Sequence, residues 1–568
     1  MLQEQTVANS PISLVRRTLF WIGKIARSRI LFWIVTAAVT AYDVFLLTGS
    51  LGRSLWLDEA FVANSVIAKT LSGIFYPTDW LQNSPPLLLV LARAVVLVFG
   101  VSNTTLRVVP VAMGILATGT MLFFALRILW KHYALLAWTM VVLSPVEIIQ
   151  ARQLKPYSSE LFVSTLVLLA CSLYIEKSSA RRFWLLVAVT AGGVLIGYGI
   201  ALLVPSVALL IWLFPSRQSS SSSGRTRLSN PFARAVVFAA IVGATVVGEY
   251  RVFSVPNGPE VYHNAFTKKN AGKSWASLAT SESYQFVGEI PLNHRFDRTG
   301  IRISSAAILL LIGLILSWKR YRHGRPKWFA IQVVCLLPCL TLLVCDHFVL
   351  YPFTERTSLF LLPFLVTALA SSLQLISLFV FARSRSWLRP VSDVLILLAI
   401  ALTLIASRAK NFRQIDPGED ADGAVSFLQA HVQPQDFLWV HSSLSQHFKL
   451  YVQMHHWQDA PAHFGNTGWP CCSRGIPETK YTSSEQLVRE DFGKALDHFS
   501  GRVWVLYTMR PEHWRGFADE PAIMRTILHE RGCTETPTPL FFHVGLDAFE
   551  CGASAAGPSQ SRSRLKLP

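Results

Sequence analysis

Long apolar runs constrain this chain more than any other feature of its sequence. Runs of roughly 20 residues recur through the first 406 positions. Each is long enough to cross a hydrocarbon layer about 30 Å thick as a helix. They predict a polytopic α-helical membrane protein with about eleven transmembrane helices, at residues 31–50, 105–127, 133–150, 158–176, 183–197, 199–215, 231–249, 301–317, 328–345, 357–381 and 390–406.

The distribution of charge supports the same class. Only 15% of the 568 residues are charged and 52% are hydrophobic, whereas a soluble domain carries about 25% charged residues. The net charge of +18 lies largely in basic connectors between apolar runs, such as 127–132 and 317–328. This is the positive-inside pattern of cytoplasmic loops, so nucleic acid is not an expected partner and the lipid bilayer is.

The orientation follows from the same rule. The basic segment 1–30 predicts a cytoplasmic N-terminus, and the run after it is too long for a signal-peptide core, so we expect an uncleaved first span. An odd number of spans then places the C-terminus outside. The expected organisation is a cytoplasmic segment at 1–30, a transmembrane domain at 31–406 with outer loops at 51–104 and 250–300, and an extracytoplasmic domain at 407–568.

Two of the outer segments have a predicted structure of their own. The stretch LLLVLARAVVLVFG is short for a span and carries Arg93, so we expect a helix lying at the outer membrane interface. The segment 407–568 alternates helical and strand patterns: GRVWVLYTM reads as a strand, and PAIMRTILHERGC as a helix leading into the extended PLFFHVGL. This alternation predicts a small α/β domain.

The cysteines and histidines also separate the two parts. An outer compartment permits disulfides, and Cys533 and Cys551 flank a predicted strand and could pair; Cys471 and Cys472 are the other cysteines of this segment. The four cysteines in apolar runs are expected to be packing residues. A metal site in MHHWQDAPAH is conceivable, but its spacing favours histidines of a surface loop. The apolar-run cysteines are Cys171, Cys335, Cys339 and Cys345.

The residues with the clearest chemistry are the adjacent acids Asp58 and Glu59, in SLWLDEAFVA just after the first apolar run. A carboxylate near hydrocarbon is costly, and partial burial makes it a candidate general base. The alternative is a helix N-terminus, where acids interact favourably with the dipole. Adjacent helical residues point about 100° apart, so one carboxylate can face a site while the other contacts a partner.

Three stretches in order, SLWLDEAFVANSVIAKTL, NSPPLLLVLARAVVLVFGVSNTTLRVVPVAMGILA and SPVEIIQARQLKPYSSELFVSTLVLLA, resemble the GT-C glycosyltransferases. The resemblance is to the RgtA/B/C/D-like group, related to protein O-mannosyltransferases and the lipid A aminoarabinose transferase. It implies a membrane glycosyltransferase of the inner (cytoplasmic) membrane that inverts the configuration at the anomeric carbon of the sugar. The donor would be a polyprenyl-phosphate-linked sugar, and the acceptor a lipid, glycan or protein hydroxyl at the outer face.

By carry-over from this family, Asp58 is the base and Glu59 supports it. The leaving group would be a lipid phosphate, so cations are expected opposite the acids, and Arg152 and Lys155 in ARQLKPYSSE meet that need. Their alternative is snorkelling to lipid headgroups. The remaining residues expected at substrate or phosphate are Tyr157, Arg356, Arg107, which alternatively anchors a span, and Asp79, which alternatively sits in a turn.

The chain departs from its relatives at one position. Ser84 stands before the PP motif, where the related branches have Lys or His, so this residue supplies no charge to a phosphate. Cations can neutralise a monophosphate leaving group, so no cofactor is expected and a divalent metal is not expected to be essential. Two other functions stay open: a transporter or flippase of lipid-linked sugars, and a ligase that attaches whole glycans.

Overall fold

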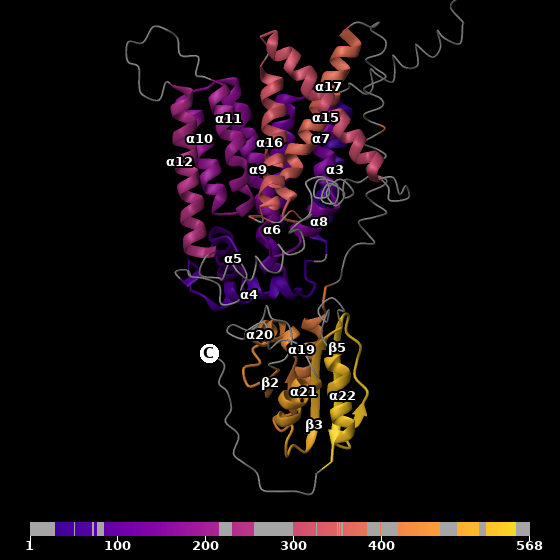
Figure 1. Ribbon diagram of the computed structural model, residues 1–568. Coiled ribbons are helices and arrows are strands. Elements are labelled where there is room, and N and C mark those ends of the chain that lie inside the picture. Colours follow the sequence, from indigo (N-terminus) through magenta and orange to yellow (C-terminus); the bar gives the residue numbers. More distant parts are fainter. Residues whose placement is uncertain are drawn as a thin grey trace, which may run out of the picture.

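The chain folds into a helical bundle with a small sheet domain at one end (Figure 1). The computed structural model describes residues 29–49, 51–70, 73–75, 84–214, 230–254, 299–324, 326–348, 350–351, 353, 356–382, 398, 418–465, 485–509 and 519–552. The helices of the bundle region are α3 (Arg29–Thr48), α4 (Leu57–Ala68), α5 (Pro86–Phe99), α6 (Asn103–Ile128), α7 (Lys131–Val142), α8 (Pro145–Ala151), α9 (Tyr157–Glu176), α10 (Ala180–Val194), α11 (Val204–Leu213), α12 (Pro231–Glu249), α15 (Thr299–Arg322), α16 (Lys327–His347) and α17 (Leu362–Ala382).

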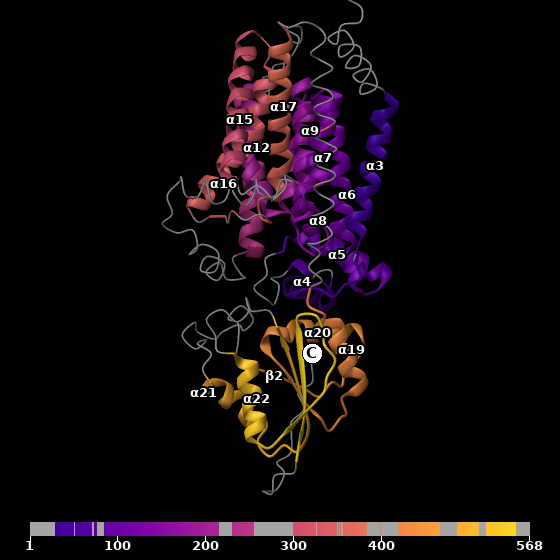
Figure 2. The ribbon, with the colours of Figure 1, turned by 90° about the vertical axis from the view of Figure 1, so that its right-hand side faces the viewer.

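The bundle contains helices with the length and composition of membrane spans. Six helices of the described chain are long and apolar enough to cross a membrane, and the bent pair α7 and α8 makes up to seven. They run side by side through the bundle (Figures 1 and 2). Two shorter apolar helices, Pro86–Phe99 and Tyr198–Leu213, do not reach spanning length. The span predicted at 390–406 falls almost entirely outside the described residues.

One predicted span is broken. The run at 133–150 was expected to form a single helix, but the chain bends by 52° between α7 and α8. Pro145 is the first residue of α8 and cannot continue the hydrogen bonds of α7, while Ser144 Oγ accepts a hydrogen bond from the Glu147 N–H. The bend turns α8 away from the axis of α7.

The predicted split in the run 183–215 is confirmed. α10 ends at Val194, and a 3₁₀ turn at Tyr198–Leu203 leads into α11. The split is tight because a Cβ atom built on Gly197 would lie 2.0 Å from Cγ of Glu160. Only glycine therefore allows the chain to pass this close to the start of α9.

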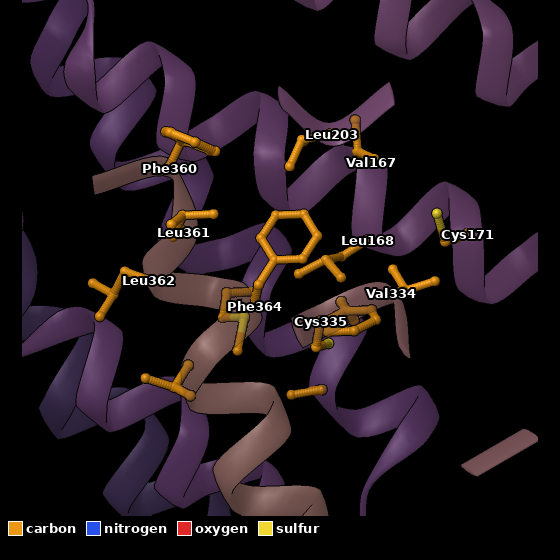
Figure 3. Close-up of a cluster of buried hydrophobic side chains, with 14 of the residues drawn as sticks. Val167, Leu168, Cys171, Leu203, Val334, Cys335, Phe360, Leu361, Leu362 and Phe364 are labelled. Carbon is orange, nitrogen blue, oxygen red and sulfur yellow. The ribbon is translucent and has the colours of Figure 1, made fainter. Parts of the chain in front are cut away.

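The bundle core is assembled from helices far apart in sequence. Figure 3 shows Phe364 of α17 beside Leu168 of α9, with Val334 and Cys335 of α16 close by. All four are buried. Cys171 and Cys335 are buried free cysteines, which confirms the expectation that they are packing residues.

Within the described residues, the C-terminal sheet has five strands in the order β2-β1-β3-β5-β4. β2, β1 and β3 are parallel, and β5 pairs antiparallel with β3 and β4. The extended segment expected at PLFFHVGL (539–546) is confirmed only at its end, because β5 begins at Val544 and continues to Cys551. The elements are α19 (Ala421–His431), β1 (Phe437–Val440), α20 (Ser445–Met454), β2 (Ala462–Phe464), α21 (Glu485–Val488), β3 (Gly501–Thr508), α22 (Glu520–Glu530), β4 (Thr534–Thr536) and β5 (Val544–Cys551).

Helices cover both faces of this sheet, with α19 and α20 on one side and α21 and α22 on the other (Figure 2). Alternating side chains of β1 reach opposite faces: Leu438 packs towards α19 and α20, and Trp439 towards α21 and α22. Cys533 and Cys551 form a disulfide, as the sequence suggested.

The bundle and the sheet domain share one apolar cluster. It combines Leu55 and Val62 of the first loop and α4 with Phe448 of α20 and Trp504 of β3. Figure 1 shows α19 and α20 directly beneath α4. The acidic segment at 58–59 therefore lies at the junction of the two parts.

Candidate functional site

The two acids of the first loop have different surroundings. They occupy the first turn of α4, and the Glu59 carboxylate accepts a hydrogen bond from the Trp56 N–H at 3.2 Å, which caps the helix. The Glu59 side chain is fully buried, whereas that of Asp58 is 26% exposed. The helical geometry thus separates a structural carboxylate from an accessible one, as the spacing predicted.

Glu59 and Arg107 form a buried ion pair that organises the junction. The guanidinium donates from Nε to Oε1 at 2.9 Å and from Nη2 to Oε2 at 2.7 Å, and both side chains are fully buried. Oε1 also accepts the Leu154 N–H at 2.7 Å. One carboxylate therefore ties α4 to α6 and to the turn between α8 and α9.

The remaining donors of Arg107 are also occupied. Nη1 donates to the carbonyl oxygens of Leu51 and Arg53, and Nη2 donates to that of Ser54. A guanidinium has five N–H groups, and all five have protein acceptors here. The structure therefore favours the anchoring alternative for Arg107 over the predicted phosphate contact.

Asp58 meets two cations that come from distant segments. Its Oδ2 lies 3.4 Å from Nη1 of Arg356, just before α17, and 3.9 Å from Nζ of Lys155, in the turn before α9. The side chain of Lys155 is 6% exposed and that of Arg356 is 28% exposed. The structure thus brings together three of the residues singled out from the sequence.

Burial shapes the chemistry of Lys155. Desolvation lowers the pKa of its ammonium group below the ordinary 10.5, and the charge of Arg356 lowers it further. The carboxylate of Asp58 opposes these effects. The ammonium is therefore held in a place where an additional anion would stabilise its charged form.

Two tyrosines border the cluster of Asp58, Lys155 and Arg356. Tyr157 begins α9 and lies within electrostatic reach of Arg356 and Asp58. The hydroxyl of Tyr351 donates to the Thr357 carbonyl at 3.3 Å, next to Arg356 in the chain. Tyr157 was expected at this site, but Tyr351 was not, because nothing in its local sequence marks it.

Arg152 does not join this cluster. It is buried at the end of α8, and its Nη2 donates to the Leu46 carbonyl in the last turn of α3. Burial, with nearby Arg53, lowers the pKa of Arg152 to about 10. Within the described residues Arg152 contacts the Leu46 carbonyl and interacts with the charged groups Arg53 and Glu147, which does not place it opposite the acids as expected. Asp79 lies outside the described residues.

Glu160 is a polar residue of this region that the sequence reasoning missed. It is buried in the first turn of α9, and Oε1 accepts the Gly199 N–H at 3.1 Å. Its side chain lies within electrostatic reach of Tyr157 and Tyr351. An acid inside an apolar run is itself a signal of function, and that signal was available at Glu160.

The described residues hold no group of three or more His, Cys, Asp or Glu side chains placed to bind a metal ion. Ser84, the uncharged residue before the PP motif, is buried immediately before α5. Lys155 and Arg356 are thus the cations that the described structure gathers around Asp58.

Comparison with known proteins identifies the fold. No protein-family model and no curated protein sequence matches the chain. Two solved structures of ArnT from Cupriavidus metallidurans match it at 14% identity. The apo form covers 94% of this chain and 100% of its own, with a TM-score of 0.51. The form bound to undecaprenyl phosphate covers 93% and 99%, with a TM-score of 0.52.

An oligosaccharyltransferase from Archaeoglobus fulgidus also matches, at 12% identity over 89% of this chain and 73% of its own, with a TM-score of 0.47. The assignment rests on the ArnT structures alone. ArnT, the lipid A aminoarabinose transferase, belongs to the GT-C class, so the fold expected from the sequence resemblance is confirmed.

Proposed function

We propose that this GT-C-fold chain is a membrane glycosyltransferase that moves a sugar from a polyprenyl-phosphate-linked donor to an acceptor hydroxyl. The observation that carries the proposal is the Asp58 carboxylate held between Lys155 and Arg356, three residues that come together only in the folded chain. One ArnT structure with this fold holds undecaprenyl phosphate, the leaving group of such a reaction. A base beside two phosphate-binding cations is the arrangement that the reaction requires.

The proposed reaction is a single displacement. Lys155 and Arg356 bind the phosphate oxygens of the donor, with the guanidinium suited to paired contacts. The acceptor oxygen attacks the anomeric carbon while its proton passes to Asp58, and the bond from that carbon to the phosphate oxygen breaks. Polyprenyl phosphate leaves, and attack from the opposite side inverts the anomeric centre.

Several features support an outer location for this site. The basic connectors between apolar runs predict cytoplasmic loops at the other end of the bundle. The Cys533–Cys551 disulfide belongs to an oxidising compartment. We therefore place the sheet domain and Asp58 at the outer face of the cytoplasmic membrane, with a cytoplasmic N-terminus and a lipid, glycan or protein as acceptor.

The test is transfer by purified protein in lipid bilayers, supplied with radiolabelled polyprenyl-phosphate sugars and with candidate acceptors. Transfer that continues in the presence of a chelator supports both the activity and its independence of divalent metal. Movement of the donor across the bilayer without transfer would replace the proposal with a transporter. Transfer only from a pyrophosphate-linked glycan would replace it with a ligase.

Replacing Arg356 by Ala should weaken binding of undecaprenyl phosphate by about tenfold or more, because the charge-assisted contacts of its guanidinium with the phosphate are lost. Titration of the protein in detergent with undecaprenyl phosphate measures the dissociation constant. Arg502→Ala is the matched control, since Arg502 pairs with Glu550 in the sheet domain. Equal affinity in Arg356→Ala and wild type would remove Arg356 from the donor site.

The lowered pKa of Lys155 predicts the alkaline limit of activity. Only the protonated amine attracts phosphate, so kcat/KM should fall as the pH rises through a value below 10.5. In the window between the native pKa and 10.5 the unfolded chain binds more protons than the native one, so stability should rise while activity falls.

The measurement is kcat/KM against pH for wild type and Lys155→Arg. The guanidinium stays protonated, so the alkaline limb should move to higher pH in this variant. An alkaline limb at the same pH in both proteins would show that another group sets it.

A further inference from the structure

The loop that leads to Asp58 is held by the sheet domain through its backbone. The Leu55 N–H donates to the Tyr451 hydroxyl at 2.7 Å, and the Leu55 carbonyl accepts from Nε2 of His447 at 3.0 Å. Tyr451 and His447 lie one turn apart on α20, and all three residues are fully buried. Both backbone groups of a residue three positions before Asp58 thus depend on the other part of the molecule.

The two side chains are themselves fixed. The Tyr451 hydroxyl donates to Oδ1 of Asn103 at 3.1 Å, and Nδ2 of Asn103 donates to Oδ2 of Asp422 at 2.7 Å. Burial raises the pKa of Tyr451 above its usual range, so the hydroxyl keeps its proton. Nε2 of His447 also lies 3.1 Å from Oε2 of Glu419.

A second contact holds the preceding residue. The Ser54 hydroxyl donates to Oδ1 of Asp420 at 3.3 Å and accepts the Asp422 N–H at 3.2 Å. Ser54 and Leu55 are therefore held from one side by the sheet domain, while Arg107 holds the Ser54 carbonyl from the bundle. The loop has partners on both sides along this stretch.

We propose that the C-terminal sheet domain positions the general base, with Tyr451 and His447 as the positioning residues. This inference rests on the proposed role of Asp58. Neither side chain touches Asp58; they fix the Leu55 backbone, and Leu55 fixes the start of α4. A reacting group displaced by about 1 Å can lose about a hundredfold in rate, so loosening this loop should lower the rate of transfer.

The first test is Tyr451→Phe, which removes the hydroxyl and leaves the ring in the apolar cluster. We expect kcat to fall about tenfold to a hundredfold while KM for the donor and the dissociation constant of undecaprenyl phosphate stay within about twofold. Tyr507→Phe is the matched control: it removes a buried hydroxyl that contacts Asp547 and Arg525 in the same domain, far from Leu55 in the hydrogen-bond network. This control should keep wild-type kcat.

Two substitutions at position 447, one that keeps an N–H donor and one that removes it, give an independent readout. Gln can place an N–H near the position of Nε2, so His447→Gln should keep most of the activity, whereas His447→Leu should lose it as Tyr451→Phe does. This pair also serves if Tyr451→Phe does not fold.

The outcomes separate the two levels of the proposal. Absence of transfer in wild type defeats the glycosyltransferase function itself. An active wild type with unchanged kcat in Tyr451→Phe overturns the positioning role. Equal losses in Tyr451→Phe and Tyr507→Phe, or in both His447 variants, overturn it as well, because they would reflect domain stability instead.

Discussion

Asp58→Asn should lower the rate of sugar transfer by about 10²–10⁴-fold, the contribution of a positioned general base. The amide has the shape of the carboxylate but cannot take the acceptor proton. Lys155 and Arg356 lose their counter-charge at the same time, so binding of undecaprenyl phosphate should be retained or become tighter. Single-turnover transfer and a binding titration measure the two effects separately.

The control for this variant is Asp459→Asn, which changes an exposed acid of the sheet domain and should leave transfer unchanged. Transfer by Asp58→Asn within about threefold of wild type would remove Asp58 as the base and leave it a residue of the α4 N-terminus. If Asp58→Asn lost both the binding of undecaprenyl phosphate and the transfer of sugar, Asp58 would instead belong to the donor site.

Arg107→Met should give the largest loss of stability among single changes at the junction. It leaves the Glu59 carboxylate buried without its bidentate partner and removes the donor from the Leu51, Arg53 and Ser54 carbonyls. Removing one member of a buried ion pair costs about 3–5 kcal/mol. Denaturant titration of the purified protein in detergent micelles measures the shift.

A double-mutant cycle tests the cause. Adding Glu59→Gln to Arg107→Met removes the stranded charge, so the double variant should be more stable than Arg107→Met alone. Arg127→Met is the control, since Arg127 pairs with Glu176 at a partly exposed position and should cost at most about 1 kcal/mol. A shift for Arg107→Met as small as that of Arg127→Met would show that the pair does not hold the junction.

Six of the eleven predicted spans coincide with helices of the described chain that are long and apolar enough to cross a membrane, because each such run must match the same membrane thickness. The break between α7 and α8 could not be predicted in the same way. Pro145 ends a helix, yet Pro110 and Pro338 lie inside the unbroken helices α6 and α16. Whether a proline breaks a helix depends on what its neighbours offer the freed backbone groups, which the local sequence does not contain.

The sequence singled out Asp58, Lys155 and Arg356, which the structure brings together, because charge near an apolar run is costly enough to require a reason. The cations Arg107 and Arg152 give the same signal, but in the folded chain their guanidinium groups donate to protein acceptors. Their acceptors are a buried carboxylate and backbone carbonyls some 50 to 106 residues away in sequence. Only the folded chain shows which cations contact the accessible acid and which donate to a buried carboxylate or to backbone carbonyls.

The hydrogen bonds to the Leu55 backbone could not be predicted from the sequence either, because they also join distant segments of the chain. Tyr451 and His447 lie nearly 400 residues away, in a segment whose local pattern describes only an amphipathic helix. Their partner is a backbone group, which any residue at position 55 would present. No side-chain motif therefore records the interaction.

The apolar cluster that runs from α4 into the sheet has a consequence for how this molecule is built. Leu55 and Val62 pack against Phe448 and Trp504 in one buried cluster. The helical bundle and the sheet domain would therefore each expose apolar surface if they were separated. Cutting the chain before α19 would expose apolar surface on both fragments and promote their aggregation. The bundle and the sheet domain are then one cooperative unit. A chimera that carries the sheet domain of another protein of this fold would fold only if the contacting residues of the first loop and α4 were exchanged as well.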